Sequence, residues 1–181
     1  MTGIVLNNDL LASVSGYLGL SFSLTAMVLR SNRPLLAINA LGAIWWGLNG
    51  FFLGSLTSLS VQLVGAALTG VRLFGPERLH LNATKLSLAL VCLAAAATWQ
   101  GLSSVPVTIA TLCLIAGIGL AKGVWVRVLF LAANSFFFAH AILFNASEQI
   151  VACIACYVAI AIGVARMRNN VAETQVLKKA A

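Results

Sequence analysis

The sequence predicts an all-α protein that crosses a membrane seven times, and two observations support this fold class. First, 61% of the 181 residues are hydrophobic and only 8% are charged, whereas a soluble domain carries about 25% charged residues. Second, the Lys and Arg residues lie in alternate gaps between seven apolar segments. Because Lys and Arg are retained on the cytoplasmic side of short membrane loops, this alternation predicts an N-terminus outside and a C-terminus inside.

The first, third and fifth gaps carry the basic residues, and the second, fourth and sixth gaps carry none. The basic residues are Arg30 and Arg33, then Arg72, Arg78 and Lys85, then Lys122 and Arg127, and in the tail Arg166, Arg168, Lys178 and Lys179. Cytoplasmic loops therefore account for the net charge of +7. The sequence indicates the lipid bilayer as a partner and no nucleic acid.

Seven apolar segments have the length that a membrane span requires. A hydrocarbon core about 30 Å thick needs about 20 helical residues. The predicted spans are 10–29, 35–53, 56–74, 86–102, 105–121, 128–144 and 150–166. We therefore expect residues 1–181 to form a single membrane domain, with residues 167–181 as a cytoplasmic tail.

The first two spans have clear boundaries. Asp9 precedes the first span and no basic region does, so the segment is not a signal peptide. Arg30 and Arg33 end this span. Pro34 opens the second span, at a helix start where its missing N–H costs little.

Turn residues separate the remaining spans. Gly54 and Ser55 divide the second span from the third, which Pro76 ends. The longest predicted connection runs from Gly75 to Lys85, and we expect His80 within it to be solvated. The other connections are Ser103-Ser104, between the fourth and fifth spans, and 145–148, between the sixth and seventh.

This order predicts two three-helix bundles that run in the same direction. Spans within 10–74 form the first bundle and spans within 105–166 the second, joined by the 86–102 span as an inversion helix. Such parallel repeats are related by an axis along the membrane normal. A weak sequence repeat at an offset of 92 residues agrees, because it aligns Arg30 with Lys122.

The predicted membrane interior holds no charged side chain. The four acidic residues, Asp9, Glu77, Glu148 and Glu173, all lie outside the spans. Pumps and ion-coupled transporters usually need intramembrane carboxylates, so their absence favours uncoupled movement of a neutral solute. No nucleophile and base pair is visible either, so we expect no enzyme.

Neutral polar residues mark the candidate binding site in the first bundle. Asn39, Gly42, Trp46 and Asn49 follow one another at i, i+3, i+7 and i+10 and so share one helix face. This face could line a polar cavity, or it could form hydrogen bonds between helices without binding anything. Gln62, in the third span, belongs to the same candidate site.

The second bundle contributes Asn134, His140 and Tyr157. His140 either contacts a ligand or acts as a proton-sensitive gate, or it is a neutral packing residue, and these alternatives stay open. The C-x-x-C pair Cys153 and Cys156 has no second pair beside it, so we expect apolar packing and no metal or cofactor.

Two stretches resemble a known family. The run Ala43–Gly54 looks like the second-helix pattern of the YgjV-like bacterial inner-membrane proteins, and the segment Arg127–Phe144, with His140, looks like their sixth-helix pattern. The topology also resembles SWEET sugar facilitators and nicotinamide-riboside-type vitamin transporters. The resemblance implies a transporter-like fold in the bacterial inner membrane and names no substrate.

The predicted function is facilitated transport of a small neutral solute, such as a sugar, nucleoside or vitamin, by alternating access. The predicted substrate-binding residues are Asn39, Trp46, Asn49, Gln62, Asn134, His140 and Tyr157. The alternative is a non-transporting accessory or sensor protein, which the absence of SWEET-type kinking prolines favours. Whether the chain forms a homo-oligomer stays open.

Overall fold

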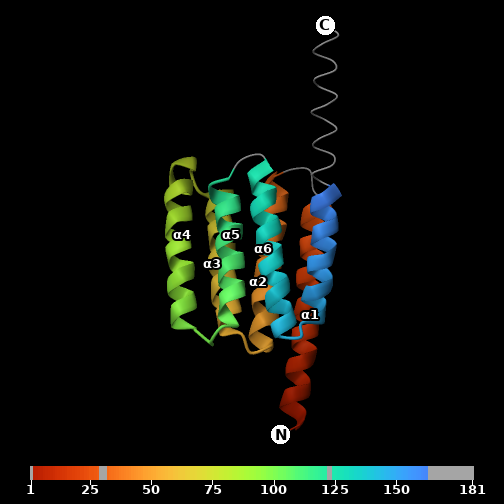
Figure 1. The fold of residues 1–181 in the computed structure, drawn as a ribbon. Helices are drawn as coiled ribbons and strands as arrows, with labels where there is room; N and C mark the ends of the chain where they lie inside the picture. The colour runs from red at the N-terminus through yellow and green to blue at the C-terminus, as the bar shows by residue number, and fades with distance from the viewer. Residues whose placement is uncertain (1, 29–31, 122–123, 163–181) are drawn as a thin grey trace.

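The computed structural model describes residues 2–28, 32–121 and 124–162, which form seven helices and no strand. The helices are α1 (Thr2–Val28), α2 (Asn32–Phe52), α3 (Leu56–Phe74), α4 (Glu77–Ala97), α5 (Ser104–Gly119), α6 (Val124–Leu143) and a seventh helix, Ser147–Ile162. The all-α fold class and the number of helices are therefore confirmed. Successive helices run in opposite directions (Figure 1).

Six of the helices form a ring. α2 packs between α1 and α3, α3 also packs against α5, and α5 packs against α6. The seventh helix closes the ring, because it forms hydrogen bonds with both α6 and α1. α4 lies outside the ring, where it packs against α3 and α5 at one edge of the molecule (Figure 1).

The packing of the helices differs from the expected pair of separate three-helix bundles. Within the described residues α1 and α3 make no contact with each other, because α2 lies between them. The first three helices are therefore a row, and the six helices of both halves together make one ring. The inversion helix α4 serves as a brace on one contact between the halves.

The observed helix boundaries agree with the predicted span in the third helix, and they differ most from it in the fourth. α3 occupies Leu56–Phe74, as predicted, and the Ser55 hydroxyl caps it by accepting from the Ser58 N–H at 3.2 Å. The long connection predicted after Gly75 is wrong, because α4 begins at Glu77. Pro76 precedes the first helical residue, and the negative charge of Glu77 is favourable in a first helical turn.

His80 consequently lies in α4 and not in a solvated loop. Its Nε2 lies 3.2 Å from the carbonyl oxygen of Gly75, just before the helix. The start of α4 is polar and gives no apolar signal, so the predicted span 86–102 begins too late in the chain.

Two helix ends share one backbone motif. At the end of α2 the Ser55 N–H donates to the Gly50 carbonyl, and the Gly54 N–H donates to the Phe51 carbonyl. At the end of α6 the Ala146 N–H donates to the Ala141 carbonyl, and the Asn145 N–H donates to the Ile142 carbonyl. This pair of bonds is the Schellman motif, which needs a left-handed residue and favours Gly or Asn there. Gly54 has φ +89° and Asn145 has φ +50°.

The motif corrects the register of the internal repeat. Gly54 is equivalent to Asn145, and their numbers differ by 91, not by the predicted 92. The same offset relates Ser13 to Ser104 and Thr57 to Glu148, which form the corresponding hydrogen bonds Ser13–Glu148 and Thr57–Ser104. Both halves of the chain therefore contain the same arrangement of helices.

The hydrophobic core lies where α3, α4 and α5 meet. Its buried residues are Val61, Leu68, Val91, Ala95, Val107 and Ile115. The Phe137 ring of α6 packs against this core. At the corrected offset Phe137 is equivalent to Trp46, which packs against α1.

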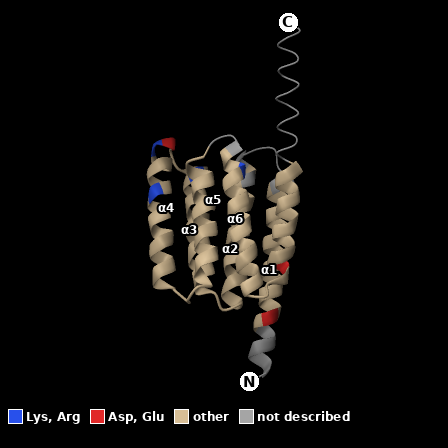
Figure 2. Cartoon of the chain, in the orientation of Figure 1, with Lys and Arg blue, Asp and Glu red and all other residues tan. Residues whose placement is uncertain are grey.

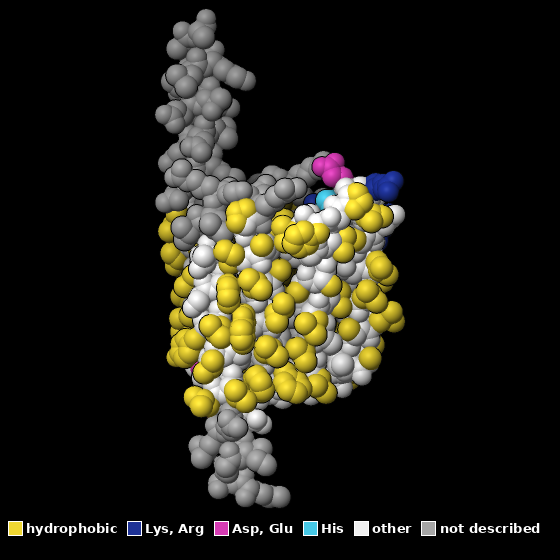
Figure 3. Space-filling view, turned by 180° about the vertical axis from the view of Figure 1, so that it is seen from behind, with side chains coloured by type: hydrophobic (Ala, Val, Ile, Leu, Met, Phe, Trp, Pro, Cys, Tyr) yellow, Lys and Arg dark blue, Asp and Glu magenta, His cyan; other side chains and the backbone are white. Residues whose placement is uncertain are grey.

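The outer surface of the molecule is apolar over most of its length. Figure 3 shows hydrophobic side chains along the whole visible face, with most of the visible charged ones at one end. Among the described residues Arg72, Arg78, Lys85 and Arg127 lie toward one end, which we call the basic end (Figure 2). Three helices within the described ranges are long and apolar enough to cross a membrane: Leu56–Phe74, Glu77–Ala97 and Trp125–Leu143.

Candidate functional site

The predicted polar stripe of α2 does form one helix face, and this face is directed at α1. A Cβ atom on Gly42 would lie 3.4 Å from Phe22 of α1. The Trp46 indole N–H donates to the Ser23 hydroxyl at 3.0 Å. A Cβ atom on Gly19 would lie 2.9 Å from the Trp46 ring, so glycine allows the indole to lie flat on α1.

Asn49 ends this stripe and is 1% exposed. Its Nδ2 donates to the Ala12 carbonyl at 2.8 Å. Its Oδ1 is buried and has no hydrogen-bond partner among the described residues. A buried acceptor without a donor costs about 1–3 kcal/mol, so this oxygen is available to accept from a water molecule or from a polar ligand.

Gln62 and Asn39 are the other two predicted site residues of the first half. Gln62 is 4% exposed on α3, and its Cβ would lie 3.3 Å from a Cβ atom on Gly47. It thus lies at the contact between α2 and α3. Asn39 is half-buried on α2, nearer the basic end.

The predicted residues of the second half link α6 to the seventh helix. Asn134 donates through Nδ2 to the Cys153 carbonyl at 2.9 Å. The Tyr157 hydroxyl donates to the Ser135 hydroxyl at 2.9 Å. Both contacts join helices that are consecutive in the chain, as hydrogen bonds between packed membrane helices do.

His140 is fully buried, with 0% exposure, in the last turn of α6. Its Nδ1 lies 3.5 Å from Oε1 of Gln149, and its ring lies 4.6 Å from that of Phe144, between centroids. With Nδ1 donating to this oxygen, Nε2 is an acceptor. Like Asn49 Oδ1, this Nε2 has no partner among the described residues.

Asn49 and the first turn of the seventh helix both lie beside Gly16 of α1, at the end opposite the basic end. A Cβ atom on Gly16 would lie 2.9 Å from Asn49 Nδ2 and 3.0 Å from Glu148 Cβ. The absent side chain therefore lets α2 and the seventh helix both reach the α1 backbone. Gln149, the partner of His140, follows Glu148 in the chain.

Glu148 and Ser13 are site residues that the sequence reading missed. The Ser13 hydroxyl donates to Glu148 Oε1 at 2.9 Å, and Glu148 is half-buried. The sequence predicts Glu148 in the connection 145–148, whereas the residue lies in the first turn of the seventh helix. One signal could have identified it: an acidic residue directly after Ser147 is typical of a first helical turn.

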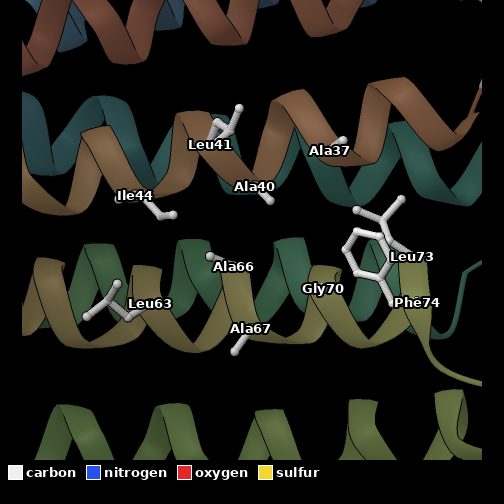
Figure 4. Close-up of a pocket in the computed structure, with 10 residues that line it drawn as sticks. All are labelled: Ala37, Ala40, Leu41, Ile44, Leu63, Ala66, Ala67, Gly70, Leu73 and Phe74. Atoms are coloured by element: carbon white, nitrogen blue, oxygen red, sulfur yellow. The ribbon is translucent and has the colours of Figure 1, made fainter.

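One groove on the described surface is lined by apolar residues. This groove of about 530 Å³ runs between α2 and α3 and faces outward. Its lining residues are Ala37, Ala40, Leu41, Ile44, Leu63, Ala66, Ala67, Gly70, Leu73 and Phe74 (Figure 4). None of the predicted site residues lines it, so it is unsuited to a polar solute.

No group of three or more His, Cys, Asp or Glu residues in the described part of the chain could hold a metal ion. Cys153 is buried beside α6, and its backbone carbonyl accepts a hydrogen bond from the Asn134 side chain. This agrees with a packing role.

Comparisons with family models, with curated proteins and with solved structures found no match to this chain. The fold and the candidate site therefore define a seven-helix protein with an apolar surface and two equivalent buried polar positions.

Proposed function

We propose that this chain is a membrane protein in which all seven helices span the bilayer, with the basic end in the cytoplasm. The apolar outer surface supports this, because a water-soluble protein rarely exposes so much contiguous apolar area. The three helices that are long and apolar enough to cross a membrane support it as well. The bacterial inner membrane, as location, rests on the resemblance to the YgjV-like family.

We propose further that the protein transports a small neutral solute by alternating access. One observation carries this proposal: Asn49 and His140 occupy equivalent places in the two halves, and each buries a polar atom that lacks a partner among the described residues. Transporters built from parallel repeats bind their substrate between the repeats. The two groups, one in each half, are therefore the candidates to hydrogen-bond the solute.

The chemistry of these atoms restricts the solute. Asn49 Oδ1 is an acceptor, and so is His140 Nε2 when Nδ1 donates to Gln149. A solute that satisfies both must offer at least two hydrogen-bond donors, as hydroxyl-rich sugars and nucleosides do. The Phe144 ring lies 4.6 Å from the His140 ring, between centroids, and could stack on an apolar face of the solute.

The remaining predicted residues would have supporting roles. Asn134 and Tyr157 hold the seventh helix on α6, and Gln62 lies at the α2–α3 contact. In this proposal they keep the two binding positions in place, and Asn39 lies toward the cytoplasmic side of the path. No catalytic step and no cofactor is assigned to them.

Uptake by proteoliposomes tests this function. Purified protein would be reconstituted and offered a panel of radiolabelled sugars, polyols, nucleosides and vitamins. We expect uptake of at least one donor-rich solute above empty vesicles, and loss of most of it in Asn49→Leu and His140→Leu. Ser21→Ala is the control, because the Ser21 hydroxyl bonds only its own helix on an exposed face. Uptake that is absent for every solute, or unchanged in both variants, would refute the proposal.

The second candidate is a non-transporting accessory protein. It is favoured by the observation that Trp46, Asn134 and Tyr157 all find hydrogen-bond partners within the protein. A partner that copurifies in fixed stoichiometry, combined with the absence of uptake, would support this candidate over transport.

A further inference from the structure

Two contacts join the halves of the ring, and they are equivalent by the repeat. We call the contact between α1 and the seventh helix the α1 seam, and the contact between α3 and α5 the α5 seam. The α1 seam contains the Ser13–Glu148 hydrogen bond at 2.9 Å. The α5 seam contains the equivalent pair, Thr57 and Ser104, whose hydroxyl oxygens lie 3.0 Å apart.

The α5 seam is braced by α4. Thr57 also donates to the Thr98 carbonyl at 2.6 Å, and the Gln100 N–H donates to the Ser104 hydroxyl at 3.0 Å. The Gln100 side chain in turn donates to the Gly54 carbonyl at 2.7 Å. The connection between α4 and α5 thus ties the end of the α5 seam to the α2–α3 turn.

The hydrophobic core lies on the same side. Its buried residues come from α3, α4 and α5, the three helices that meet at the α5 seam. Because burial of apolar side chains scales with area, opening this seam would expose large groups such as Leu68 and Ile115. This makes the α5 seam the more rigid of the two contacts.

The α1 seam is built from smaller and more polar groups. Gly16 and Ala12 of α1 are buried in this region, and Glu148 lies directly on Gly16. Ser13 and Glu148 are only part-buried, so water can replace their hydrogen bond when the helices separate. Glu148 stands where the fully buried Thr57 stands in the other seam.

We propose that the α1 seam is the outer gate of the protein and that Glu148 holds this gate closed, while the α5 seam stays closed as a pivot. In the closed state the carboxylate accepts from Ser13, and a hydrogen bond to a charged acceptor is about twice as strong as a neutral one. Opening the gate would expose the region of Asn49 and His140 to the outer side. The purpose assigned to this gate rests on the proposed transport, whereas the motion can be measured without any solute.

Distances between spin labels at four exposed positions test the gate. Leu11 and Ser147 flank the α1 seam, and their equivalents Leu102 and Leu56 flank the α5 seam. Each pair would be labelled in a background in which Cys92, Cys113, Cys153 and Cys156 are replaced by alanine. The distance between the two labels would be measured in lipid nanodiscs by pulsed electron paramagnetic resonance.

We expect two distance populations for the Leu11–Ser147 pair and one for the Leu56–Leu102 pair. Glu148→Ala and Ser13→Ala should both shift the first pair toward the longer distance, and Glu148→Gln should shift it less because it keeps an acceptor. Asp9→Asn is the matched control, since Asp9 is an exposed acidic residue of α1 one turn before Ser13.

Hydrogen exchange provides a second measurement that leaves the cysteines in place. Amides of residues 147–152 should exchange faster in Glu148→Ala than in Asp9→Asn, and those of residues 57–62 should not. A single α1-seam distance unaffected by Glu148→Ala, or a change confined to the α5 seam, would overturn the proposal. If the α1 seam opens but no solute is taken up, only the transport function is refuted and the gate stands.

Discussion

Asn49 and His140 occupy equivalent positions at the ends of α2 and α6, each five residues before the left-handed residue that ends its helix. Both side chains are almost fully buried, and each has one polar atom with a partner and one without among the described residues. The Schellman motif at each helix end sets this position, because it determines which carbonyls and side chains belong to the last turn.

The two equivalent residues have different hydrogen-bond partners. Asn49 bonds a backbone carbonyl of α1, whereas His140 bonds the side chain of Gln149 on the seventh helix. The two equivalent positions therefore differ in the chemistry of their partners.

Gly16→Ala should destabilise the protein. The added methyl group would lie 2.9 Å from Asn49 Nδ2 and 3.0 Å from Glu148 Cβ, and overpacking of this kind typically costs about 1–3 kcal/mol. The measurement is the free energy of unfolding in mixed micelles. Gly70→Ala is the control, because no atom lies within 4 Å of its added methyl, and equal destabilisation by both substitutions would contradict the described contact.

Gly54→Ala and Asn145→Gly should act differently. Alanine at φ +89° is strained, and a left-handed conformation costs an L-residue about 1–2 kcal/mol. Glycine at position 145 meets no such strain, so Asn145→Gly should change the free energy of unfolding little. The same unfolding titration compares them, and a tolerated Gly54→Ala would mean that this helix does not end in the described motif.

Thr57→Val should weaken the α5 seam. The Thr57 side chain is 0% exposed, and its hydroxyl donates to the Thr98 carbonyl at 2.6 Å and lies 3.0 Å from the buried Ser104 hydroxyl. Valine removes the partner of both groups, at a cost of about 1–3 kcal/mol. Thr25→Val makes the same chemical change on an exposed face of α1, where the hydroxyl bonds only its own helix. If both variants unfold at the same temperature, α4 does not brace this seam through Thr57.

Membrane topology can be tested by cysteine accessibility in intact cells. We expect a single cysteine at Leu102, between α4 and α5, to react with a membrane-impermeant maleimide added outside. A single cysteine at Arg78, near the start of α4, should react only after the cells are permeabilised, because Lys and Arg mark the cytoplasmic side. Labelling of both positions from the same side would exclude a spanning α4.

Much of the fold could be predicted from the sequence because helices and turns depend on neighbouring residues. Apolar length and turn residues located all seven helices, and α3 at Leu56–Phe74 agrees with its predicted span. The start of α4 was missed because Glu77 to Lys85 is polar and gives no apolar signal.

The candidate site could be predicted only in part. The shared face of Trp46 and Asn49 was visible as a helical spacing, but the neighbour that this face contacts, α1, was not. Glu148 was missed because its significance depends on Ser13, which lies 135 residues earlier in the chain.

The sequence by itself determined the all-α class, the seven helices and the placement of basic residues at one end, since composition, local turns and charge spacing are encoded along the chain. Only the tertiary structure decided the ring of six helices, the 91-residue register of the repeat and the Ser13–Glu148 contact. The physical reason is that each of these depends on which side chains fit and bond across helices, where a single glycine such as Gly16 determines how closely two backbones approach.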